Sequence, residues 1–324
     1  MISMNRIVGM GLAASAVLLA ALALAAMRPA AAVAGASAGA AGQGPIRVQV
    51  NLVNLFATVR DKKTKKIVTT LEQSDFKVSE DNVEQKVVAF SRETSLPITL
   101  GLLIDTSGSE EGALGAEQDA AIRFLNRVLR KGDLAMVISF DSDADLLSSF
   151  TDDRMMLERA IRRTRIAGGS MAGPMGGDPP GTVFYDAVYL ACQDRLAQEA
   201  GRKALVIMTD AQDNGSRMRA QDAIEAAQRT DTVVHVLLIS SGFTNEGAAK
   251  KLTDETGGRT IEVRSEKNLE QAFDQISEEL RSQYTLGYYS MNTARDGSFR
   301  KVKVETTRKD VDVLSRRGYY APKN

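Results

Sequence analysis

An apolar run that ends abruptly in an acidic, serine-rich loop is the feature that most constrains how this chain can fold. Residues 98–109 read ITLGLLIDTSGS. Residues 100–104 are four apolar residues and one glycine without polar alternation, which is typical of a strand buried on both faces, as in a parallel sheet covered by helices. Residues 105–109 would then form the loop at the carboxyl end of that strand, where open α/β sheets bind their ligands. The sequence therefore predicts an α/β fold with a candidate site in this loop.

Three side chains with hard oxygen atoms alternate in the loop: Asp105, Ser107 and Ser109, in the pattern D-x-S-x-S. A turning loop can direct all three at one point, and such oxygens suit Mg²⁺, Mn²⁺ or Ca²⁺ better than zinc. In the alternative interpretation, Asp105 caps the next helix and the serines fill a turn. The loop by itself leaves both interpretations open.

Two later stretches favour the metal site. In the sequence GTVFYDA, residues 181–187, a Gly/Pro-rich loop gives way to a helix with Thr182 at its start. Residues 205–210, LVIMTD, are a second apolar strand that ends in Asp210. Together the three segments resemble the metal-ion-dependent adhesion site (MIDAS) of von Willebrand factor type A domains, in which D-x-S-x-S, a distant Thr and a later Asp surround one divalent cation.

The resemblance covers residues 96–281 and implies a Rossmann-like, doubly wound domain with a mostly parallel central sheet. It implies that Ser107 and Ser109 bind the cation directly, Thr182 directly or through water, and Asp105 and Asp210 mostly through water. The cation would be Mg²⁺, or Mn²⁺ or Ca²⁺. None of the five positions departs from the motif. The whole chain most resembles the von Willebrand factor A-related proteins of Acidobacteria, through phrases such as SDFKVSEDNVEQKVVAFSRE, TDAQDNGSR and RRGYYAP.

The N-terminal residues 1–44 are interpreted as a targeting segment. Arg6 precedes an apolar run over residues 7–27, and an Ala-rich tract with several small-x-small sites follows. This pattern predicts a secretory signal peptide. The run is also just long enough to span a bilayer, so an uncleaved membrane anchor is the alternative. Either interpretation places the body of the protein outside the inner membrane, in the periplasm, at the cell surface or in the medium.

The remaining chain is expected to form one central domain and a smaller β module. Residues 45–95 show short alternating strands, expected at 46–59, 76–82 and 85–90, which suggest an immunoglobulin-like module. Residues 96–282 would be the von Willebrand factor type A domain, with a helix over about 182–200. Residues 283–324 return to strands and are expected to pack on the 45–95 module, with Asp296-Gly297 as a hairpin signal. The segment 168–181 has six Gly and three Pro among fourteen residues and is expected to shape access to the site.

Composition argues against several classes of function. Lys plus Arg and Asp plus Glu number 41 each, so no global charge favours nucleic acid. The single cysteine, Cys192, permits no intrachain disulfide and is interpreted as a small buried residue. The only histidine, His235, lies in an apolar strand, whereas Ser-His-Asp hydrolysis needs a histidine beside an exposed serine. Neither G-x-S-x-G nor a P-loop motif occurs. The chain is therefore not expected to be an enzyme.

The resemblance implies that the cation is a binding device. Neutral Ser and Thr ligands leave it electrophilic, and an open coordination position would accept an Asp or Glu carboxylate from a partner protein. The expected function is an exported, metal-ion-dependent protein-binding or adhesion module, with residues 7–27 as a potential membrane tether. Two alternatives are a metal-dependent hydrolase that uses the same cation to activate water, and a structural exported scaffold whose site is unoccupied.

Overall fold

The computed structural model describes residues 52–92, 96–108, 114–166, 181–239 and 243–323. The described residues belong to one compact unit, Gln49–Asn324. Three sequence predictions fall outside them: the targeting segment 1–44, residues 168–180 of the Gly/Pro-rich segment, and Ser109. Among the described residues, no helix has the length and apolar character needed to cross a membrane.

A six-stranded sheet forms the centre of the fold, in the order β10-β9-β8-β5-β6-β7. All neighbouring strands are parallel except β7, which is antiparallel to β6. All eight residues of β5 are buried, which confirms a strand covered on both faces. The strands are β5 (Ile98–Asp105), β6 (Leu134–Phe140), β7 (Ala144–Thr151), β8 (Arg202–Thr209), β9 (Thr232–Ile239) and β10 (Thr260–Val263).

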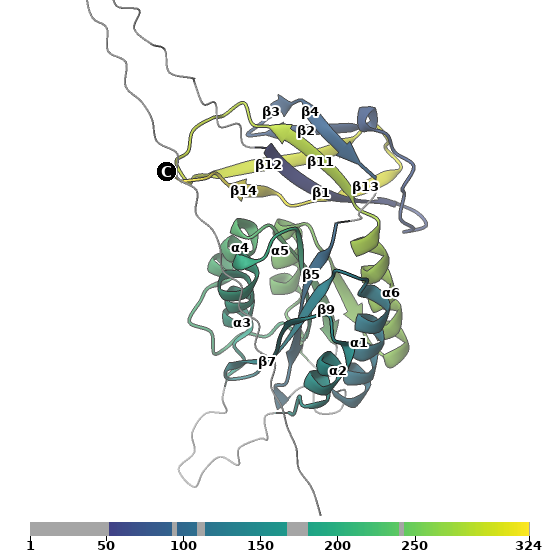
Figure 1. The fold of residues 1–324 in the computed structure, drawn as a ribbon, viewed down its shortest axis with the longest axis vertical. Coiled ribbons are helices and arrows are strands. Elements are labelled where there is room, and N and C mark those ends of the chain that lie inside the picture. The colour runs from purple at the N-terminus through teal and green to yellow at the C-terminus, as the bar shows by residue number, and fades with distance from the viewer. Residues whose placement is uncertain (1–51, 93–95, 109–113, 167–180, 240–242, 324) are drawn as a thin grey trace, which may run out of the picture. The chain divides into compact units, whose positions relative to one another are not determined.

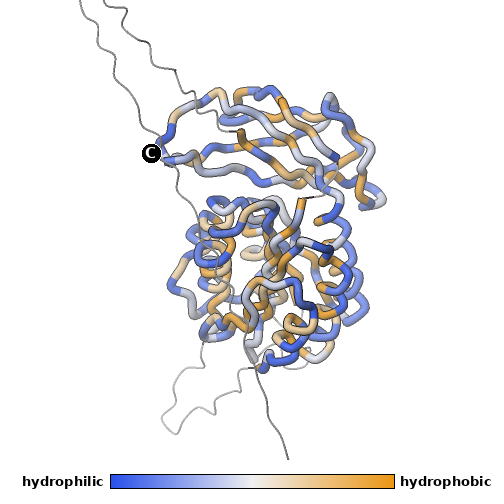
Figure 2. The backbone as a smooth tube through the Cα atoms, in the orientation of Figure 1, coloured by the Kyte–Doolittle hydropathy of each residue, from blue (hydrophilic) through white to orange (hydrophobic). Residues whose placement is uncertain are grey.

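Helices cover both faces of this sheet, as Figure 1 shows. Leu100, Leu102 and Ile104 of β5 pack toward one group of helices, and Leu103 packs toward the other. Figure 2 shows hydrophobic residues concentrated on the central strands, with hydrophilic residues on the outer sides of the helices. The predicted doubly wound α/β fold is therefore confirmed. The first group is α1 (Leu114–Val128), α2 (Arg154–Arg162) and α6 (Glu266–Arg281); the second is α3 (Phe184–Leu190), α4 (Ala220–Arg229) and α5 (Glu246–Thr256).

Strands from both ends of the chain form two further four-stranded sheets, with the orders β13-β1-β11-β4 and β14-β12-β2-β3. All their strand pairs are antiparallel, and they enclose a hydrophobic core that includes Leu55, Val59, Leu286 and Val302. The predicted sandwich-like module of N- and C-terminal strands is thus present. Its strands are β1 (Leu52–Asp61), β2 (Phe76–Glu80), β3 (Val83–Gln85), β4 (Val87–Ser91), β11 (Tyr284–Tyr289), β12 (Phe299–Thr306), β13 (Val311–Leu314) and β14 (Gly318–Tyr320).

Three local predictions were wrong. The single strand expected over 85–90 is two strands, because the chain crosses from one sheet to the other at Lys86. Asp296-Gly297 is not the turn of a hairpin, since β11 and β12 lie in different sheets. The helix expected over 182–200 is regular only in α3 and continues as the π-helical turn η3 (Ala191–Arg195) and the 3₁₀ turn η4 (Leu196–Gln198).

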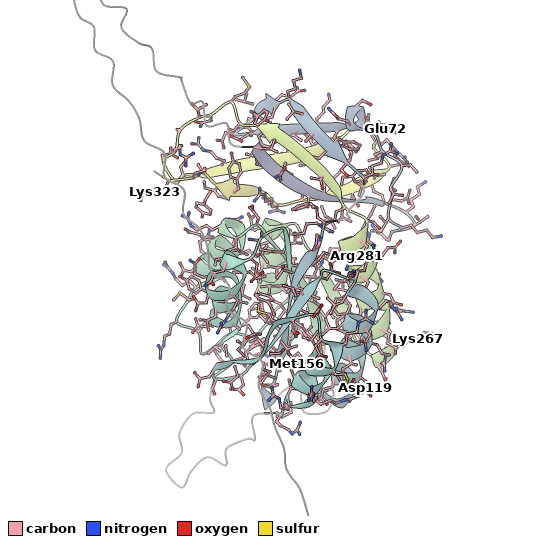
Figure 3. All side chains as sticks on the ribbon, in the orientation of Figure 1. Glu72, Asp119, Met156, Lys267, Arg281 and Lys323 are labelled. Carbon is pink, nitrogen blue, oxygen red and sulfur yellow. The ribbon has the colours of Figure 1, made fainter. Side chains whose placement is uncertain are left out.

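Helix α6 connects the central domain directly to the β module. Only Ser282 and Gln283 separate its end from β11. Arg281, labelled in Figure 3, donates a hydrogen bond to the carboxylate of Asp133, which also accepts the N–H of Ile98 at 2.8 Å. The end of α6 is therefore fastened to the beginning of both β5 and β6.

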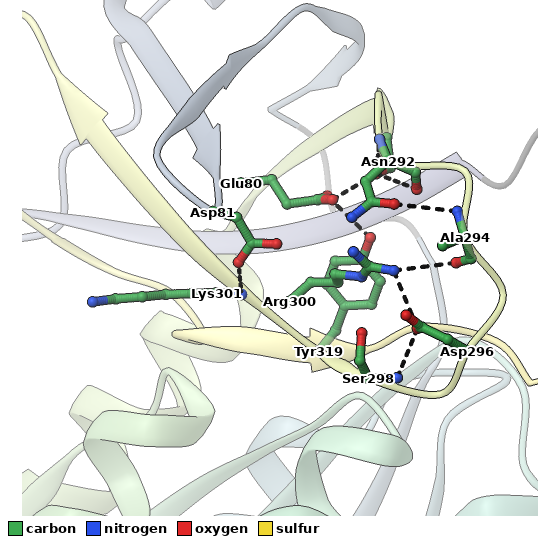
Figure 4. Close-up of polar contacts among 10 residues, drawn as sticks. Glu80, Asp81, Asn292, Ala294, Asp296, Ser298, Arg300, Lys301 and Tyr319 are labelled. Atoms are coloured by element: carbon green, nitrogen blue, oxygen red, sulfur yellow. Dashed lines mark hydrogen bonds and ion pairs between the residues drawn. The ribbon is translucent and has the colours of Figure 1, made fainter.

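A buried carboxylate joins three strands of the β module, and Figure 4 shows its contact with Tyr319. Glu80, the last residue of β2, is 2% exposed. Its Oε2 accepts the hydroxyls of Tyr288 at 2.8 Å and Tyr319 at 3.0 Å, and its Oε1 accepts the hydroxyl of Ser290 at 2.6 Å. Tyr319 lies in the short strand β14, so Glu80 helps to hold that strand in place.

Replacing Glu80 with alanine is expected to lower the free energy of unfolding by about 2 kcal/mol or more, because three hydroxyls lose their acceptor and the removed side chain leaves a cavity. Chemical denaturation of both proteins measures the difference. Glu84→Ala is the matched control, because Glu84 is an exposed residue of the neighbouring strand β3. Equal losses in the two variants would contradict a structural role for the buried carboxylate.

Candidate metal centre

The central strands bring two predicted ligands to the same edge of the sheet. Asp105 is the last residue of β5, and Asp210 directly follows β8. The two strands are parallel neighbours, with Ile104 opposite Met208. Because carboxyl ends of parallel strands meet at one edge, Asp105 and Asp210 lie at the ligand-binding edge of the sheet.

Asp105 is fully buried and held through both oxygen atoms. Its Oδ1 accepts the N–H of Ser107 at 2.9 Å, and its Oδ2 accepts the hydroxyl of Thr209 at 2.6 Å. Burial raises the pKa of Asp105 to about 6, the hydrogen bonds from Ser107 and Thr209 oppose the rise, and the charge of Asp210 adds to it. Burial is the largest of these influences on the pKa of Asp105, and the charge of Asp210 is the smallest.

Asp210 is held by Gln212 and by the segment that follows β9. Its Oδ1 accepts the backbone N–H of Gln212 at 2.9 Å, and its Oδ2 accepts Nε2 of the same side chain at 3.3 Å. Its carbonyl accepts the N–H of Asn245 at 2.8 Å. The orientation of this carboxylate is therefore fixed by the protein.

Hydrogen bonds with Asn214 and Gly215 hold Thr182 in place, and we call this set of contacts the clasp. Its N–H donates to Oδ1 of Asn214 at 2.5 Å, and its carbonyl accepts the N–H groups of Asn214 at 3.2 Å and Gly215 at 3.0 Å. The loops meet backbone to backbone, since a Cβ added to Gly181 would lie 2.9 Å from the backbone carbonyl of Asn214, and one on Gly215 would lie 2.8 Å from the carbonyl oxygen of Gly181. The clasp places Thr182 just before the first turn of α3.

A groove of about 350 Å³ opens beside this clasp. It is lined by parts of the β6–β7 turn, of α3 and of the segment before α4, and these include Asp143, Tyr189, Leu190, Arg217 and Met218. The side chain of Arg217 is exposed. The candidate metal site therefore borders a partly apolar hollow.

The described ligands fit a divalent cation. Carboxylates and hydroxyls are hard donors, and Asp105, Ser107, Thr182 and Asp210 come from loops that hydrogen bonds join at one edge. Within the described ranges, neither carboxylate has a basic partner, and the hydroxyl of Thr182 makes no hydrogen bond. No three His, Cys, Asp or Glu side chains cluster in this part of the chain, so the hydroxyls are essential to the proposed set. The fifth residue of that set, Ser109, lies outside the described residues.

Several residues that organise the site were not identified from the sequence. Thr209 was assigned only to a strand, and residues 211–216 were assigned to a turn. Oδ1 of Asp213 accepts the N–H of Tyr185 at 3.3 Å and the hydroxyl of Ser216. Asp213 therefore fixes the start of α3. The Asn-Gly pair at 214–215 was the one available signal of a close backbone approach.

His235 and Cys192 are buried away from this edge. His235 lies mid-strand in β9, opposite Val206, and is 2% exposed. Its Nδ1 is 3.9 Å from Oε2 of Glu279, but Oε1 of that carboxylate already accepts Arg259 at 2.6 Å and has Arg60 nearby. Burial, followed by the charge of Arg259, lowers the pKa of His235 to about 3.

Burial also raises the pKa of the Cys192 thiol to about 12. A thiol with such a high pKa is not a nucleophile at neutral pH, and a neutral, enclosed imidazole cannot collect protons at the sheet edge. Neither side chain can therefore serve as a catalytic group at the candidate site.

His235 is expected to make the protein sensitive to acid. A histidine with a pKa near 6.5 when unfolded and about 3 when folded contributes stability that is complete above pH 6.5. That stability is lost at up to about 1.4 kcal/mol per pH unit as the pH falls toward 3. Denaturation of wild type and His235→Gln across this range measures the effect. The difference in stability between the two proteins should shift in favour of the variant as the pH falls, and a constant difference would contradict the prediction.

The fold defines a class of protein: an open, doubly wound α/β domain with Asp105 and Asp210 at the carboxyl edge of its central sheet. Residues 100–212 match the family model of the von Willebrand factor type A domain, and this range includes all five predicted ligands. The chain therefore contains a von Willebrand factor type A domain.

A sequence relative is the Calcium-activated chloride channel regulator 1 of Bos taurus, which is 26% identical over 189 residues. The match covers 54% of this chain but only 18% of the regulator's own length. Most of the regulator therefore lies outside the match.

Similar solved structures include the von Willebrand factor type A protein from Catenulispora acidiphila, with a TM-score of 0.49 and 11% identity. The match covers 86% of this chain and 75% of that chain. Proximal thread matrix protein 1 from the mussel byssus, solved with a zinc-occupied MIDAS motif, has a TM-score of 0.48 and 14% identity, and covers 62% of this chain and 49% of its own. BatB from Bacteroides thetaiotaomicron has a TM-score of 0.44 and 18% identity, with coverage of 56% and 98%.

Proposed function

We propose that this protein is an exported, metal-ion-dependent protein-binding module. A divalent cation, Mg²⁺ or else Mn²⁺ or Ca²⁺, would be held by Asp105, Ser107, Ser109, Thr182 and Asp210. A partner protein would supply an Asp or Glu carboxylate to the cation. Export rests on the apolar and Ala-rich character of residues 1–44.

The observation that carries the proposal is a pair of carboxylates, Asp105 and Asp210, that have no basic partner among the residues that the structure describes. Burial raises the pKa of Asp105 to about 6, and the charge of Asp210 adds a smaller contribution in the same direction. Two such acids repel each other when ionised, so a divalent cation between them removes an unfavourable interaction. Both carboxylates are also hydrogen-bonded to protein donors, which favours contact with the cation through water. The direct ligands would then be neutral hydroxyls, and the cation would keep its attraction for an external carboxylate.

We propose binding rather than catalysis. A metal-dependent hydrolase needs a group that accepts a proton near the metal-bound water. The only histidine is enclosed in β9, and Asp213 is engaged by Tyr185 and Ser216. Assays of phosphoester and peptide hydrolysis with Mg²⁺ and Mn²⁺ should give no turnover above that of Asp105→Ala.

Selection of short random peptides tests the function directly. The purified protein is immobilised with Mg²⁺, and bound peptides are eluted with EDTA. The enriched peptides should share an Asp or Glu, and its replacement by Asn or Gln should abolish binding. Enrichment that persists in EDTA, or that does not depend on an acidic residue, would refute the proposal.

A further inference from the structure

Phe243 is the most exposed large hydrophobic side chain among the described residues. It is 91% exposed, compared with 71% for Met291 and 70% for Met155. Aromatic side chains bury large apolar areas when they pack against another surface, and they are enriched among the residues that dominate protein interfaces. A fully hydrated phenylalanine is therefore a candidate contact for a partner.

The backbone of Phe243 is fastened to the candidate metal site. Nε2 of Gln212 donates to the carbonyl of Phe243 at 2.5 Å and to Oδ2 of Asp210 at 3.3 Å. Two residues later, the N–H of Asn245 donates to the carbonyl of Asp210 at 2.8 Å. The protein thus fixes the main chain beside a proposed metal ligand and leaves the ring in water.

The position of Phe243 determines what it can contact. Phe243 follows β9, the strand next to β8, and β8 leads directly to Asp210. The groove, which includes Met218, adjoins the clasp and α3 instead. If a carboxylate of the partner bound the cation, the adjoining part of the partner would contact the Phe243 side, the groove side, or both. Arg217 lines the groove together with Met218, so the groove side presents a charged side chain beside its apolar one.

We propose that Phe243 is an apolar anchor for the partner, which is a protein whose metal-binding Asp or Glu adjoins an apolar surface that covers the ring. This inference rests on the proposed function, because the cation determines where the partner is placed. It adds a specificity requirement: an acidic residue alone does not suffice, and an apolar residue must accompany it.

The test uses the peptide selection with Mg²⁺ on three full-length proteins: wild type, Phe243→Ala and Met291→Ala. Met291 is the matched control, because it is similarly exposed but lies beyond the end of β11 in the β module. Peptides selected on wild type should combine an acid with a large apolar residue at a constant spacing. Phe243→Ala should weaken these peptides about tenfold or more and leave Mg²⁺ affinity unchanged, whereas Met291→Ala should do neither.

The outcomes separate the two proposals. If peptides still require an acid and Mg²⁺ but bind Phe243→Ala as well as wild type, the anchor is refuted and the metal-dependent function stands. If Met218→Ala removes the apolar preference and Phe243→Ala does not, the anchor is also refuted, because the groove then supplies the apolar contact. If no peptide depends on an acid and on Mg²⁺, both proposals fail.

Discussion

Replacing Asp105 with alanine is expected to lower the affinity for Mg²⁺, Mn²⁺ and Ca²⁺ by about 100-fold or more while the protein remains folded. Asp105 orients the loop through the N–H of Ser107 and is linked to β8 through Thr209. Residues that orient metal ligands typically account for about 10–100-fold in affinity, and Asp105 also supplies negative charge. The fold should persist because the variant removes a buried carboxylate whose burial is itself unfavourable.

Calorimetric titration of each cation measures the affinity, and a thermal melt without metal verifies the fold. Asp143→Ala is the control, because Asp143 is an exposed acid at the same edge that is not among the predicted ligands. Asp105→Asn retains an acceptor for Thr209 but lacks the charge, so it should also bind the cations weakly. Wild-type affinity in Asp105→Ala would show that this edge does not hold the ion.

Replacing Gly181 with alanine is expected to weaken cation binding by about tenfold or more, although residue 181 is not a proposed ligand. The added Cβ would lie 2.7 Å from Oδ1 of Asn214 and 2.9 Å from its backbone carbonyl. Contacts this short with backbone atoms cannot be relieved by a side-chain rotation, so the two loops must separate. Separation breaks the clasp and displaces Thr182 from the other ligands.

The same calorimetric titration tests this prediction, with Gly115→Ala as the control, since a Cβ at Gly115 meets nothing within 4 Å. Asn214→Asp should behave nearly like wild type because it keeps an acceptor for the N–H of Thr182, whereas Asn214→Ala should resemble Gly181→Ala. If Gly181→Ala binds cations like wild type, the position of Thr182 is unimportant, and its role as a ligand would be contradicted.

The central sheet could be predicted because its signals are local. The run before Asp105 and the run before Asp210 each lack polar alternation, and both are buried strands in the structure. Four of the five predicted ligand positions lie in described loops at one edge, and their role in metal binding remains a proposal.

The residues that hold the ligands could not be predicted, because their roles depend on contacts between distant segments. Asn214 acts on Thr182 across 32 residues, and Thr209 acts on Asp105 across 104 residues. The prediction of a single strand over residues 85–90 was wrong for a similar reason. Nothing in the segment 83–91 indicates that the chain leaves one sheet at Gln85 and enters another at Val87, since each half has ordinary strand character.

The way α6 enters β11 has a consequence for protein engineering. β4 and β11 are hydrogen-bonded neighbours, with Ser91 opposite Thr285, so the chain leaves the β module and returns to it at adjacent points. We propose boundaries near 45–95, 96–282 and 283–324, which make the von Willebrand factor type A domain an insertion between two paired strands. Insertions of this kind are tolerated when their ends lie close together. A short turn from β4 to β11 should therefore yield a self-contained sandwich, into which a different binding domain could be grafted at the same position.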